Sequence, residues 1–349
     1  MTLSDQWGLQ FPLIQAPMAG AQGSAMAIAV CQAGGLGSLP GAMLSLEALQ
    51  AELITITSAT NLPYNVNFFC HVPPPPNPAA DAAWRTRLHP YFDEFGGDAS
   101  AIPAGPGRAP FSHEAADVLE TFKPAVVSFH FGLPAPDLLA RVKSWGSSIM
   151  ASATTLEEAV WLQAQGANAI IAQGWEAGGH RGIFLNDDLS TQMGTFALLP
   201  QIVKAVNVPV IAAGGIADAA GVAAAMALGA AGVQVGTAYL LCPQATTSAL
   251  HRAALASPAA AHTAVTNIFT GRPARGIVNR AMRELGPLNA QVPAFPLPAP
   301  PMAALRTQAE RAGKDDFTPL WAGQNVSGCK GVDAAEITRG LALGFAPKF

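Results

Sequence analysis

The stretch Ala169–Gly182, AIIAQGWEAGGHRG, combines three features that suit an active site. It opens with a short apolar run of the kind that forms a strand covered on both faces, as in a parallel sheet. Three glycines follow, and a glycine-rich turn lets backbone N–H groups approach a ligand and bind anionic or carbonyl oxygens. His180 comes next, and an imidazole exchanges protons near neutral pH. The pattern predicts an active-site edge, although a turn histidine that bonds a neighbouring carbonyl would show the same residues.

Two glycine-containing turns nearer the C-terminus suit a phosphate group. The first is Gly214–Gly215, which follows an apolar run and precedes a helix-like stretch with Asp218 in the N-cap position. The second contains Gly236 and Thr237, again after an apolar run. Free backbone amides and the positive end of a helix dipole both favour an anion at such turns. Because the two turns lie about one βα unit apart, the pair is a more specific phosphate signal than either turn alone.

The elements that must position these turns repeat along the chain. Apolar runs alternate with stretches of helical periodicity, of which the one beginning at Thr155 has capping-box spacing with Glu158. Eight strands are predicted: Leu13–Met18, Gly35–Leu39, Tyr64–Phe69, Ala125–Phe131, Ser148–Ala153, Ala169–Gln173, Val208–Ala213 and Gly232–Thr237. The alternation predicts an α/β fold, a TIM (β/α)8 barrel with its active site at the C-terminal strand ends and a phosphate at the loops after strands seven and eight.

Two segments do not fit the repeat and predict an added substrate-side subdomain. The first, residues 71–111, is rich in proline and glycine, and it leaves the third strand on the active-site side. The second, residues 263–349, lies beyond the eighth strand and its helix. We therefore predict a barrel over residues 1–262, with an insertion at 71–111 near the mouth, and a C-terminal segment over 263–349 that covers the active site.

Composition excludes several classes of partner. The 349 residues are 50% hydrophobic and 12% charged, with a net charge of −4 and no basic patch, so nucleic acid is not expected. No apolar run is long enough to cross a membrane, and the N-terminus lacks the basic start of a signal peptide, so we expect a cytoplasmic protein. The four cysteines are far apart, and the histidines form no HxH or HExxH motif, so neither disulfides nor a metal site is expected.

The residues at the predicted barrel mouth favour a flat heteroaromatic ligand. Amides, small residues and apolar groups dominate there, and ionisable side chains are few. A sugar phosphate would need more hydroxyl partners and usually a lysine or a carboxylate pair for acid–base chemistry. Flavin mononucleotide suits both ends of the site, with its ring over strands one, three and six and its phosphate at strands seven and eight.

The chain resembles the nitronate monooxygenase family, formerly called 2-nitropropane dioxygenases, along nearly its whole length. The resemblance is carried by six motifs in the family's order, of which the fourth is the most specific: QAPMAG at Gln15–Gly20, NVNFF at Asn65–Phe69, VSFHFG at Val127–Gly132, QGWEAGGHRG at Gln173–Gly182, AAGGIAD at Ala212–Asp218 and QVGTAYL at Gln234–Leu240. It implies an FMN-containing barrel that oxidises propionate 3-nitronate and other alkyl nitronates with O2.

The resemblance also implies roles for individual residues. The catalytic residue would be His180, as a general base or as the group that positions the nitro group. Pro17, Met18 and Ala19 would lie beside the flavin ring, and Asn67 and Gln173 would lie at its polar edge. Gly178 would supply a backbone contact to the cofactor. The residues around the phosphate would be Gly215, Gln234, Gly236 and Thr237. The segment Trp321–Gln324 resembles a family segment near the substrate, but tyrosines that cover the pocket elsewhere in the family are scarce in this tail.

Two other functions stay open from the sequence. An FMN-dependent NAD(P)H reductase, acting on an enoyl-ACP or a quinone, would use the same flavin-holding turns. A cofactor-free phosphosugar-binding barrel, a lyase or isomerase, would use the two phosphate turns alone. The oligomeric state is also open, with a homodimer as one candidate.

Overall fold

The computed structural model describes residues 2–98, 102 and 108–345. Part of the predicted insertion at 71–111 and the last residues of the predicted C-terminal segment therefore lie outside the described residues. The strands of the described chain are as follows: β1 Leu13–Gln15, β2 Gly37–Pro40, β3 Tyr64–Phe69, β4 Val126–His130, β5 Ser148–Ala153, β6 Ala169–Gln173, β7 Gly179–His180, β8 Val210–Ala213, β9 Gly232–Val235, β10 Thr263–Thr266 and β11 Ala274–Ile277.

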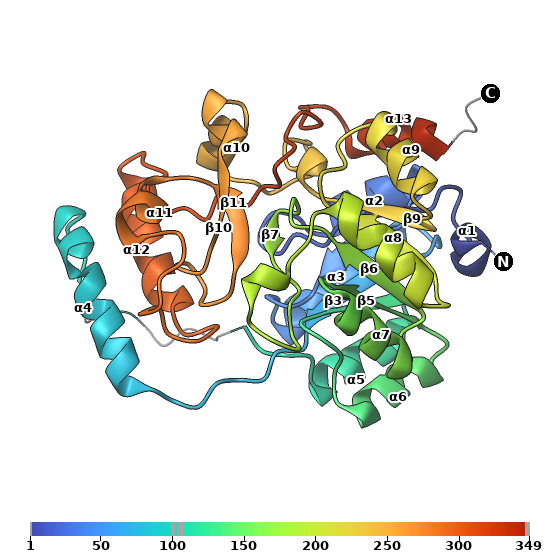
Figure 1. The fold of residues 1–349 in the computed structure, drawn as a ribbon, viewed down its shortest axis with the longest axis horizontal. Helices are drawn as coiled ribbons and strands as arrows, with labels where there is room; N and C mark the ends of the chain where they lie inside the picture. Colours follow the sequence, from blue (N-terminus) through green and yellow to red (C-terminus); the bar gives the residue numbers. More distant parts are fainter. Residues whose placement is uncertain (1, 99–101, 103–107, 346–349) are drawn as a thin grey trace.

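The helices fall between and after these strands (Figure 1). Their bounds are as follows: α1 Leu3–Trp7, α2 Ser24–Gln32, α3 Leu46–Ala59, α4 Pro78–Glu94, α5 His113–Phe122, α6 Pro136–Ser144, α7 Leu156–Ala164, α8 Thr195–Ala205, α9 Ala219–Ala227, α10 Ala249–Leu255, α11 Arg280–Leu285, α12 Ala299–Arg311 and α13 Ala334–Ala342, with short 3-10 helices η1 Leu189–Thr191, η2 Thr237–Tyr239, η3 Pro258–Ala261 and η4 Leu343–Phe345.

Eight parallel strands form the predicted TIM barrel. Their order is β1-β9-β8-β6-β5-β4-β3-β2, so each strand pairs with its sequence neighbour once the short β7 is set aside. A parallel bridge between Ile14 and Leu36 joins β1 to β2 and nearly closes the ring. The prediction of a (β/α)8 barrel is confirmed, and the predicted strands seven and eight are β8 and β9.

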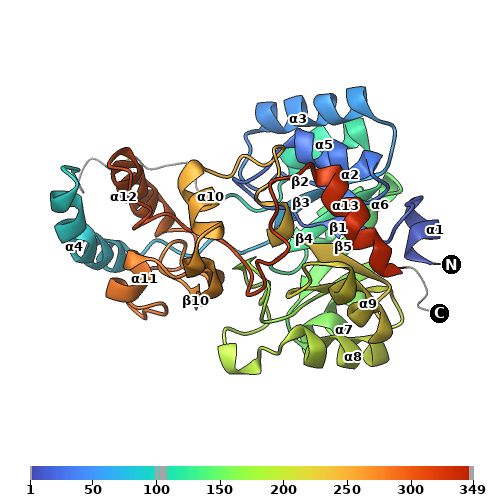
Figure 2. The same ribbon diagram turned by 90° about the horizontal axis from the view of Figure 1, so that it is seen from above.

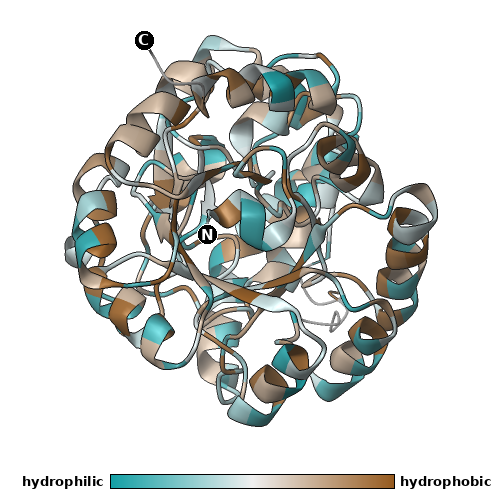
Figure 3. Ribbon diagram, turned by 90° about the vertical axis from the view of Figure 1, so that its right-hand side faces the viewer, coloured by the Kyte–Doolittle hydropathy of each residue, from teal (hydrophilic) through white to brown (hydrophobic). Residues whose placement is uncertain are grey.

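The barrel strands are buried on both faces, as their apolar composition requires. In β6, Ile171 belongs to the cluster inside the barrel, whereas Ile170 packs in the larger cluster between the sheet and the helices. Helix α1 contributes Leu3 and Trp7 to the inner cluster. Figure 3 looks along the barrel and shows the helices as an outer ring around the strands, with the N-terminal segment near the centre. The opposite end, at the C-terminal ends of the strands, is left for a ligand.

A second body packs beyond that end of the barrel (Figure 2). Its core joins Trp84 and Leu88 of α4 to Met282 of α11 and Leu305 of α12. Helix α4 lies in the segment between β3 and β4, so the insertion and the C-terminal segment share one hydrophobic core. A small antiparallel sheet, in the order β10-β11-β7, connects this body to the loop that follows β6.

The end of the described chain returns to the barrel. Helix α13 contacts α2, α9 and β1, and the hydroxyl groups of Thr338 and Tyr239 lie 3.0 Å apart. The division of the chain at residue 262 stays a prediction, because residues after 263 contribute both to the second body and to the outer layer of the barrel.

No helix in the described ranges is both long and apolar enough to span a membrane. The four cysteines are free thiols.

Several local predictions need correction. Strand β2 begins at Gly37 instead of Gly35, and β8 begins at Val210 instead of Val208. Strand β1 ends at Gln15 instead of Met18, and β9 ends at Val235 instead of Thr237 because η2 begins there. The capping box at Thr155 is only half formed. The Thr155 hydroxyl accepts a hydrogen bond from the Glu158 N–H, but the Glu158 carboxylate accepts from the backbone N–H and hydroxyl of Thr154 and from the Phe184 N–H. Glu158 thus connects α7 to the loop after β7.

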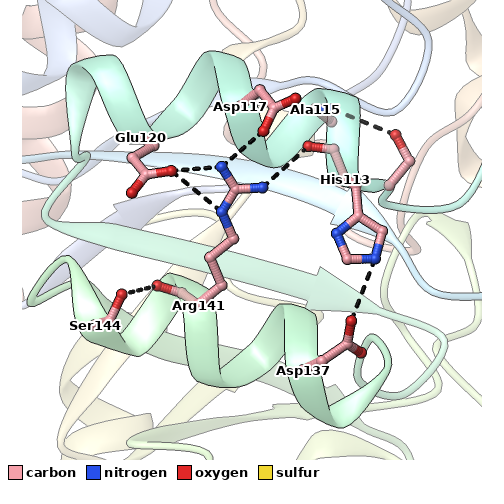
Figure 4. A network of polar contacts seen from close by, with 8 residues as sticks. His113, Ala115, Asp117, Glu120, Asp137, Arg141 and Ser144 are labelled. Atoms are coloured by element: carbon pink, nitrogen blue, oxygen red, sulfur yellow. Dashed lines mark hydrogen bonds and ion pairs between the residues drawn. The ribbon is translucent and has the colours of Figure 1, made fainter.

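An arginine joins α5 to α6 on the outside of the barrel (Figure 4). The Arg141 guanidinium lies 2.7 Å from an Asp117 carboxylate oxygen and also donates to Glu120. The hydrogen bond from Arg141 is the main cause that lowers the pKa of Glu120. A carboxylate whose pKa is lowered in the fold stabilises it above the unfolded pKa, and this contribution is lost as the pH falls through the folded pKa.

We expect Arg141→Met to lower the midpoint of thermal unfolding slightly at neutral pH. The deficit should shrink toward acid pH, where Glu120 becomes protonated and the parent also loses the pair. Thermal unfolding of both chains at about pH 7 and about pH 3, below the ordinary pKa of a glutamate, measures this. Lys330→Met, which changes an exposed cation, is the control. An Arg141 deficit that stays constant with pH would show that the ion pair is not its cause.

Candidate active site

A cavity of about 370 Å³ lies at the C-terminal ends of the barrel strands. Its walls come from the loops after β1, β6, β8 and β9, from α10, and from the second body. All eleven residues predicted from the sequence to be catalytic or cofactor-binding line this one cavity: Pro17, Met18, Ala19, Asn67, Gln173, Gly178, His180, Gly215, Gln234, Gly236 and Thr237. The structure therefore brings together residues that are far apart in the chain, while the role of each stays a prediction.

His180 lies where the barrel meets the second body. It forms β7 with Gly179 and pairs with Ala274 of β11. Its Nε2 atom lies 2.9 Å from the Thr270 hydroxyl, and its ring contacts the rings of Phe69, Phe131, Phe295 and Trp321 at centroid distances between 5.6 and 6.1 Å. The imidazole is thus held by one hydrogen bond and by packing against four aromatic rings.

The hydrogen-bond network assigns a tautomer to each of two neighbouring histidines. The Thr270 hydroxyl lies 3.4 Å from the Arg272 carbonyl, to which it can only donate, so it accepts from His180. This places the hydrogen of His180 on Nε2 and the lone pair on Nδ1. The Nε2 of His130 donates to the His180 carbonyl at 3.1 Å, so its Nδ1 accepts from the Ser152 hydroxyl at 3.0 Å. His130 supports the backbone of His180.

Burial keeps the imidazole of His180 neutral. Desolvation lowers the pKa of His180 well below its ordinary value, and the positive charges of Arg108 and Arg272 lower it further. Burial also lowers the pKa of His130 to about 4. At neutral pH the lone pair of His180 is therefore available to accept a proton.

The loop that carries His180 is anchored by arginines. Arg181 is fully buried and donates to the carbonyls of Gln173 and Gly174 and to the side-chain oxygen of Gln192. The guanidinium groups of Arg181 and Arg275 lie 5.4 and 5.3 Å from the ring of Trp175. The arginine of the GGHRG motif therefore shapes the loop and does not face the cavity.

Gln173 fixes the same loop from the barrel side. Its Nε2 donates to the His180 carbonyl at 2.9 Å, and its Oε1 accepts from the Gly182 N–H at 2.7 Å. Asn67, its counterpart on β3, donates from Nδ2 to the Ser128 hydroxyl at 2.9 Å. Both amides line the cavity while their polar atoms hold neighbouring elements in place.

Glu176, in the same motif, caps a helix. Its carboxylate accepts from the backbone N–H of Thr195 at 2.8 Å and from the Thr195 hydroxyl at 2.9 Å. Helix α8 begins there, and its own N-cap residue, Gly194, has no side chain to do this. The Thr195 hydroxyl also lies 2.9 Å from the Gly214 carbonyl, so Glu176 connects α8 to the phosphate turn.

The segment Trp321–Gln324 packs directly onto the glycine-rich loop. The Gln324 N–H donates to the Glu176 carbonyl at 2.9 Å, and the Gly323 N–H donates to the Thr237 hydroxyl at 3.0 Å. A Cβ on Gly178 would lie only 2.5 Å from the Gly323 nitrogen, so this contact requires glycine. The tail segment thus borders the cavity, as its resemblance to the family implied.

Several residues that line the cavity are not predicted from the sequence. Thr247, just before α10, and His251, on α10, both line the cavity. Each has a buried polar side-chain atom with no hydrogen-bond partner in the described structure. Arg108 and Arg306 reach the cavity from the insertion and from α12. Arginine content alone gave no signal, because these positions belong to segments without the strand–helix repeat. Among the described residues no cluster of His, Cys, Asp and Glu could hold a metal ion.

Comparisons with known proteins agree over the whole chain. The family model described as nitronate monooxygenase matches residues 1–342. The nitronate monooxygenase of Pseudomonas aeruginosa is 40% identical over 343 residues, which cover 96% of each chain. That of Paraburkholderia phytofirmans is 40% identical and covers 96% of this chain and 92% of its own.

Solved structures show the same relationship. The nitroalkane oxidase from Streptomyces ansochromogenes superposes with a TM-score of 0.88 at 36% identity, covering 97% of this chain and 96% of its own. FabK from Thermotoga maritima superposes with a TM-score of 0.71 at 24% identity, covering 99% of this chain and 96% of its own. The latter similarity shows the fold alone.

Proposed function

This chain belongs to the nitronate monooxygenase family, and from that premise we propose that it oxidises propionate 3-nitronate and other alkyl nitronates with O2. It is an oxidoreductase. One observation carries the proposal. A neutral His180 borders the same cavity as the glycine turns at Gly214–Gly215 and Gly236, so a proton acceptor and a cradle for an anionic cofactor face one space.

The family depends on a flavin, and we propose that the flavin is FMN. A buried acceptor supports this, because Gln234 Oε1 has no hydrogen-bond partner in the described structure. The resemblance implied a phosphate contact for Gln234, but an amide oxygen only accepts, so we propose that it accepts from an N–H of the ring instead. Pro17, Met18 and Ala19 offer an apolar and backbone surface beside it. Asn67, Gln173 and Gly178 would complete the ring site. The residues present therefore fit a planar ring.

The opposite end of the cavity fits a phosphate. Gly214 and Gly215 have φ angles of 115° and 75°, and a Cβ on Gly214 would lie 3.0 Å from the Ala177 nitrogen. Such a turn exposes backbone N–H groups at close range. Gly236 and Thr237 begin η2 beside it. When bound, FMN supplies the redox chemistry, because it can accept electrons from a nitronate and pass them to O2.

The chain's own residues bind and orient the substrate. For a neutral nitroalkane, the lone pair of His180 Nδ1 accepts the α-proton, since burial keeps the ring neutral. A nitronate has already lost that proton, so with this substrate His180 only orients an oxygen of the nitronate group. The rings of Phe69, Phe131 and Phe295 pack around the partly buried imidazole and limit its contact with water.

The alternatives are less well supported. The relatives at 40% identity carry the nitronate monooxygenase name, whereas the resemblance to FabK is one of fold, so an NAD(P)H reductase is not favoured. A cofactor-free phosphosugar enzyme is not favoured for the same reason, since these relatives carry the nitronate monooxygenase name. The cytoplasmic location and a homodimer stay predictions.

The visible absorbance of the purified protein tests the proposal. We expect the protein to bind FMN and its flavin band to change within the mixing time when propionate 3-nitronate is added without oxygen. Admission of O2 should restore the band. A band that ignores the nitronate but bleaches with NADH would support the reductase instead. A protein that binds no flavin after incubation with FMN would refute the cofactor assignment.

A further inference from the structure

Two arginines line the substrate side of the cavity that contains His180. Arg108 comes from the segment before α5, and Arg306 comes from α12 of the second body. Burial lowers the pKa of Arg108 to about 10, and the positive charge of Arg306 contributes to this shift. The Arg108 guanidinium is therefore charged at neutral pH and lies within electrostatic reach of Arg306.

Each of the two guanidiniums retains a buried N–H group that makes no hydrogen bond to a described residue. Nη1 of Arg108 and Nε of Arg306 are buried and have no hydrogen-bond partner in the part of the chain that the structure describes. The nearest carboxylate is that of Glu310, whose Oε1 lies 3.7 Å from Arg306 Nε and accepts a hydrogen bond from the Thr318 hydroxyl at 2.8 Å. Two positive charges with unused N–H groups at one cavity wall would be stabilised by a bound anion, which can accept hydrogen bonds from both.

The other arginine near His180 is already engaged. Arg272 donates to the Ile183 carbonyl at 2.8 Å, and its guanidinium lies 4.3 Å from the centre of the Phe131 ring. Among the described residues, the Arg108 guanidinium faces the Phe295 ring, at 5.7 Å from its guanidinium carbon. Arg108, with Arg306 beside it, is therefore the arginine near His180 that has an N–H group left to bind an anion.

We propose that Arg108, supported by Arg306, binds a carboxylate at the far end of the substrate and so selects carboxylate-bearing nitronates over nitronates with a plain alkyl chain. This inference rests on the proposed function for the reacting end of the substrate. A guanidinium donates two parallel N–H groups to a carboxylate, which gives both affinity and orientation. Arg108 and His180 both contact the Phe295 ring, at 5.7 and 5.8 Å, so a short chain whose carboxylate binds Arg108 can present its nitronate group to His180 in the same cavity.

The proposal also predicts a ligand that does not react. A nitronate and a carboxylate are both planar anions with the charge shared by two oxygens, so succinate matches propionate 3-nitronate in shape and charge. Succinate should therefore bind the flavin-loaded protein and compete with the substrate. Butyrate has the same chain length but lacks the second carboxylate, and it should bind more weakly.

Steady-state kinetics with two nitronates test the proposal. The substrates are propionate 3-nitronate and propyl-1-nitronate, which share a three-carbon chain and differ in the carboxylate. Arg108→Met should lower kcat/KM for the first by about 10- to 100-fold, the range for a hydrogen-bonded charge, and leave the second nearly unchanged. Arg306→Met should act in the same direction with a smaller effect. Arg311→Met, at the exposed end of α12, should change neither.

A second measurement separates this proposal from the proposed function. Calorimetry should show succinate binding to the parent and a loss of about 10- to 100-fold in affinity in Arg108→Met, without any turnover. Arg108→Lys, which keeps the charge but not the fork, should retain part of the preference if the variant is folded. Equal losses for both nitronates, or unchanged succinate binding, would overturn the carboxylate site. A parent that oxidises neither nitronate but binds succinate through Arg108 would refute the function and leave the anion site standing.

Discussion

A His180→Asn variant is expected to keep its flavin and to lose about 100- to 10,000-fold in kcat/KM for a neutral nitroalkane, the usual contribution of a general base. Asparagine can donate to a substrate oxygen, but it cannot accept the α-proton at neutral pH. With the preformed nitronate no proton leaves carbon, so only the orienting contact is lost and we expect a decrease of about 10-fold. Oxygen consumption with each substrate, measured on flavin-loaded protein, gives the two values.

The ratio of the two losses distinguishes the roles of His180. A variant that oxidises nitroalkane and nitronate as fast as the parent would eliminate both roles. Equal losses would eliminate the base and leave orientation. His89→Asn changes an exposed histidine on α4 and serves as the control for any general effect of losing an imidazole. The flavin content of each preparation is measured first, because a loss of cofactor would lower both rates together.

The pH dependence follows from the burial of His180. Its pKa lies well below the ordinary value of about 6.5, so the base form persists as the pH falls through that value. Nitroalkane oxidation should therefore stay constant between about pH 8 and about pH 6, whereas a solvated histidine would lose most of its base form over that interval. The sign follows from the environment, because desolvation and the nearby positive charges both disfavour the imidazolium ion.

The barrel could be predicted because each of its units carries a local signal. The strands β3, β5 and β6 have the predicted bounds, since short segments rich in apolar residues mark strands buried on both faces even where Asn or Ser interrupts them. The ends of strands are less well predicted where backbone geometry, and not hydropathy, determines the last residue of the strand. At the end of β9 the chain turns at Gly236, which has φ −117° and ψ −68°, and begins η2, although the residues there are no less suited to a strand.

The candidate site could be predicted only where it lies on the barrel. Asn67, Gln173 and Gln234 stand on or at the ends of strands, so the topology brings them to one edge. Arg108 and Arg306 could not be found in this way, because they reach the cavity through tertiary packing of the second body. The sequence pattern likewise does not say that Glu176 caps α8, since the helix and its cap are 19 residues apart. The fold is therefore needed to separate the motif residues that face the cavity from those that hold the scaffold.

Arg181 belongs to the scaffold, and Arg181→Met should be the most destabilising change in the glycine-rich motif. The guanidinium is fully buried and satisfies the carbonyls of Gln173 and Gly174 and the side chain of Gln192. Methionine fills similar volume but leaves these acceptors without a donor in a place that water does not reach. We expect the free energy of unfolding to fall by about 3–5 kcal/mol, as for other broken buried polar networks. Denaturant unfolding of the parent and the variant measures the difference.

The flavin affinity of the Arg181 variant separates local from global effects. Because the guanidinium fixes the carbonyls on either side of the turn after β6, its loss should weaken flavin binding even in protein that remains folded. Arg181→Lys restores a charge with fewer and differently placed donors, so it should recover less than half of the lost stability if the fork geometry matters. Arg339→Met, at an exposed site on α13, should change neither property. Full recovery by lysine would show that charge alone holds the loop, and an unchanged unfolding midpoint in Arg181→Met would contradict the structural role itself.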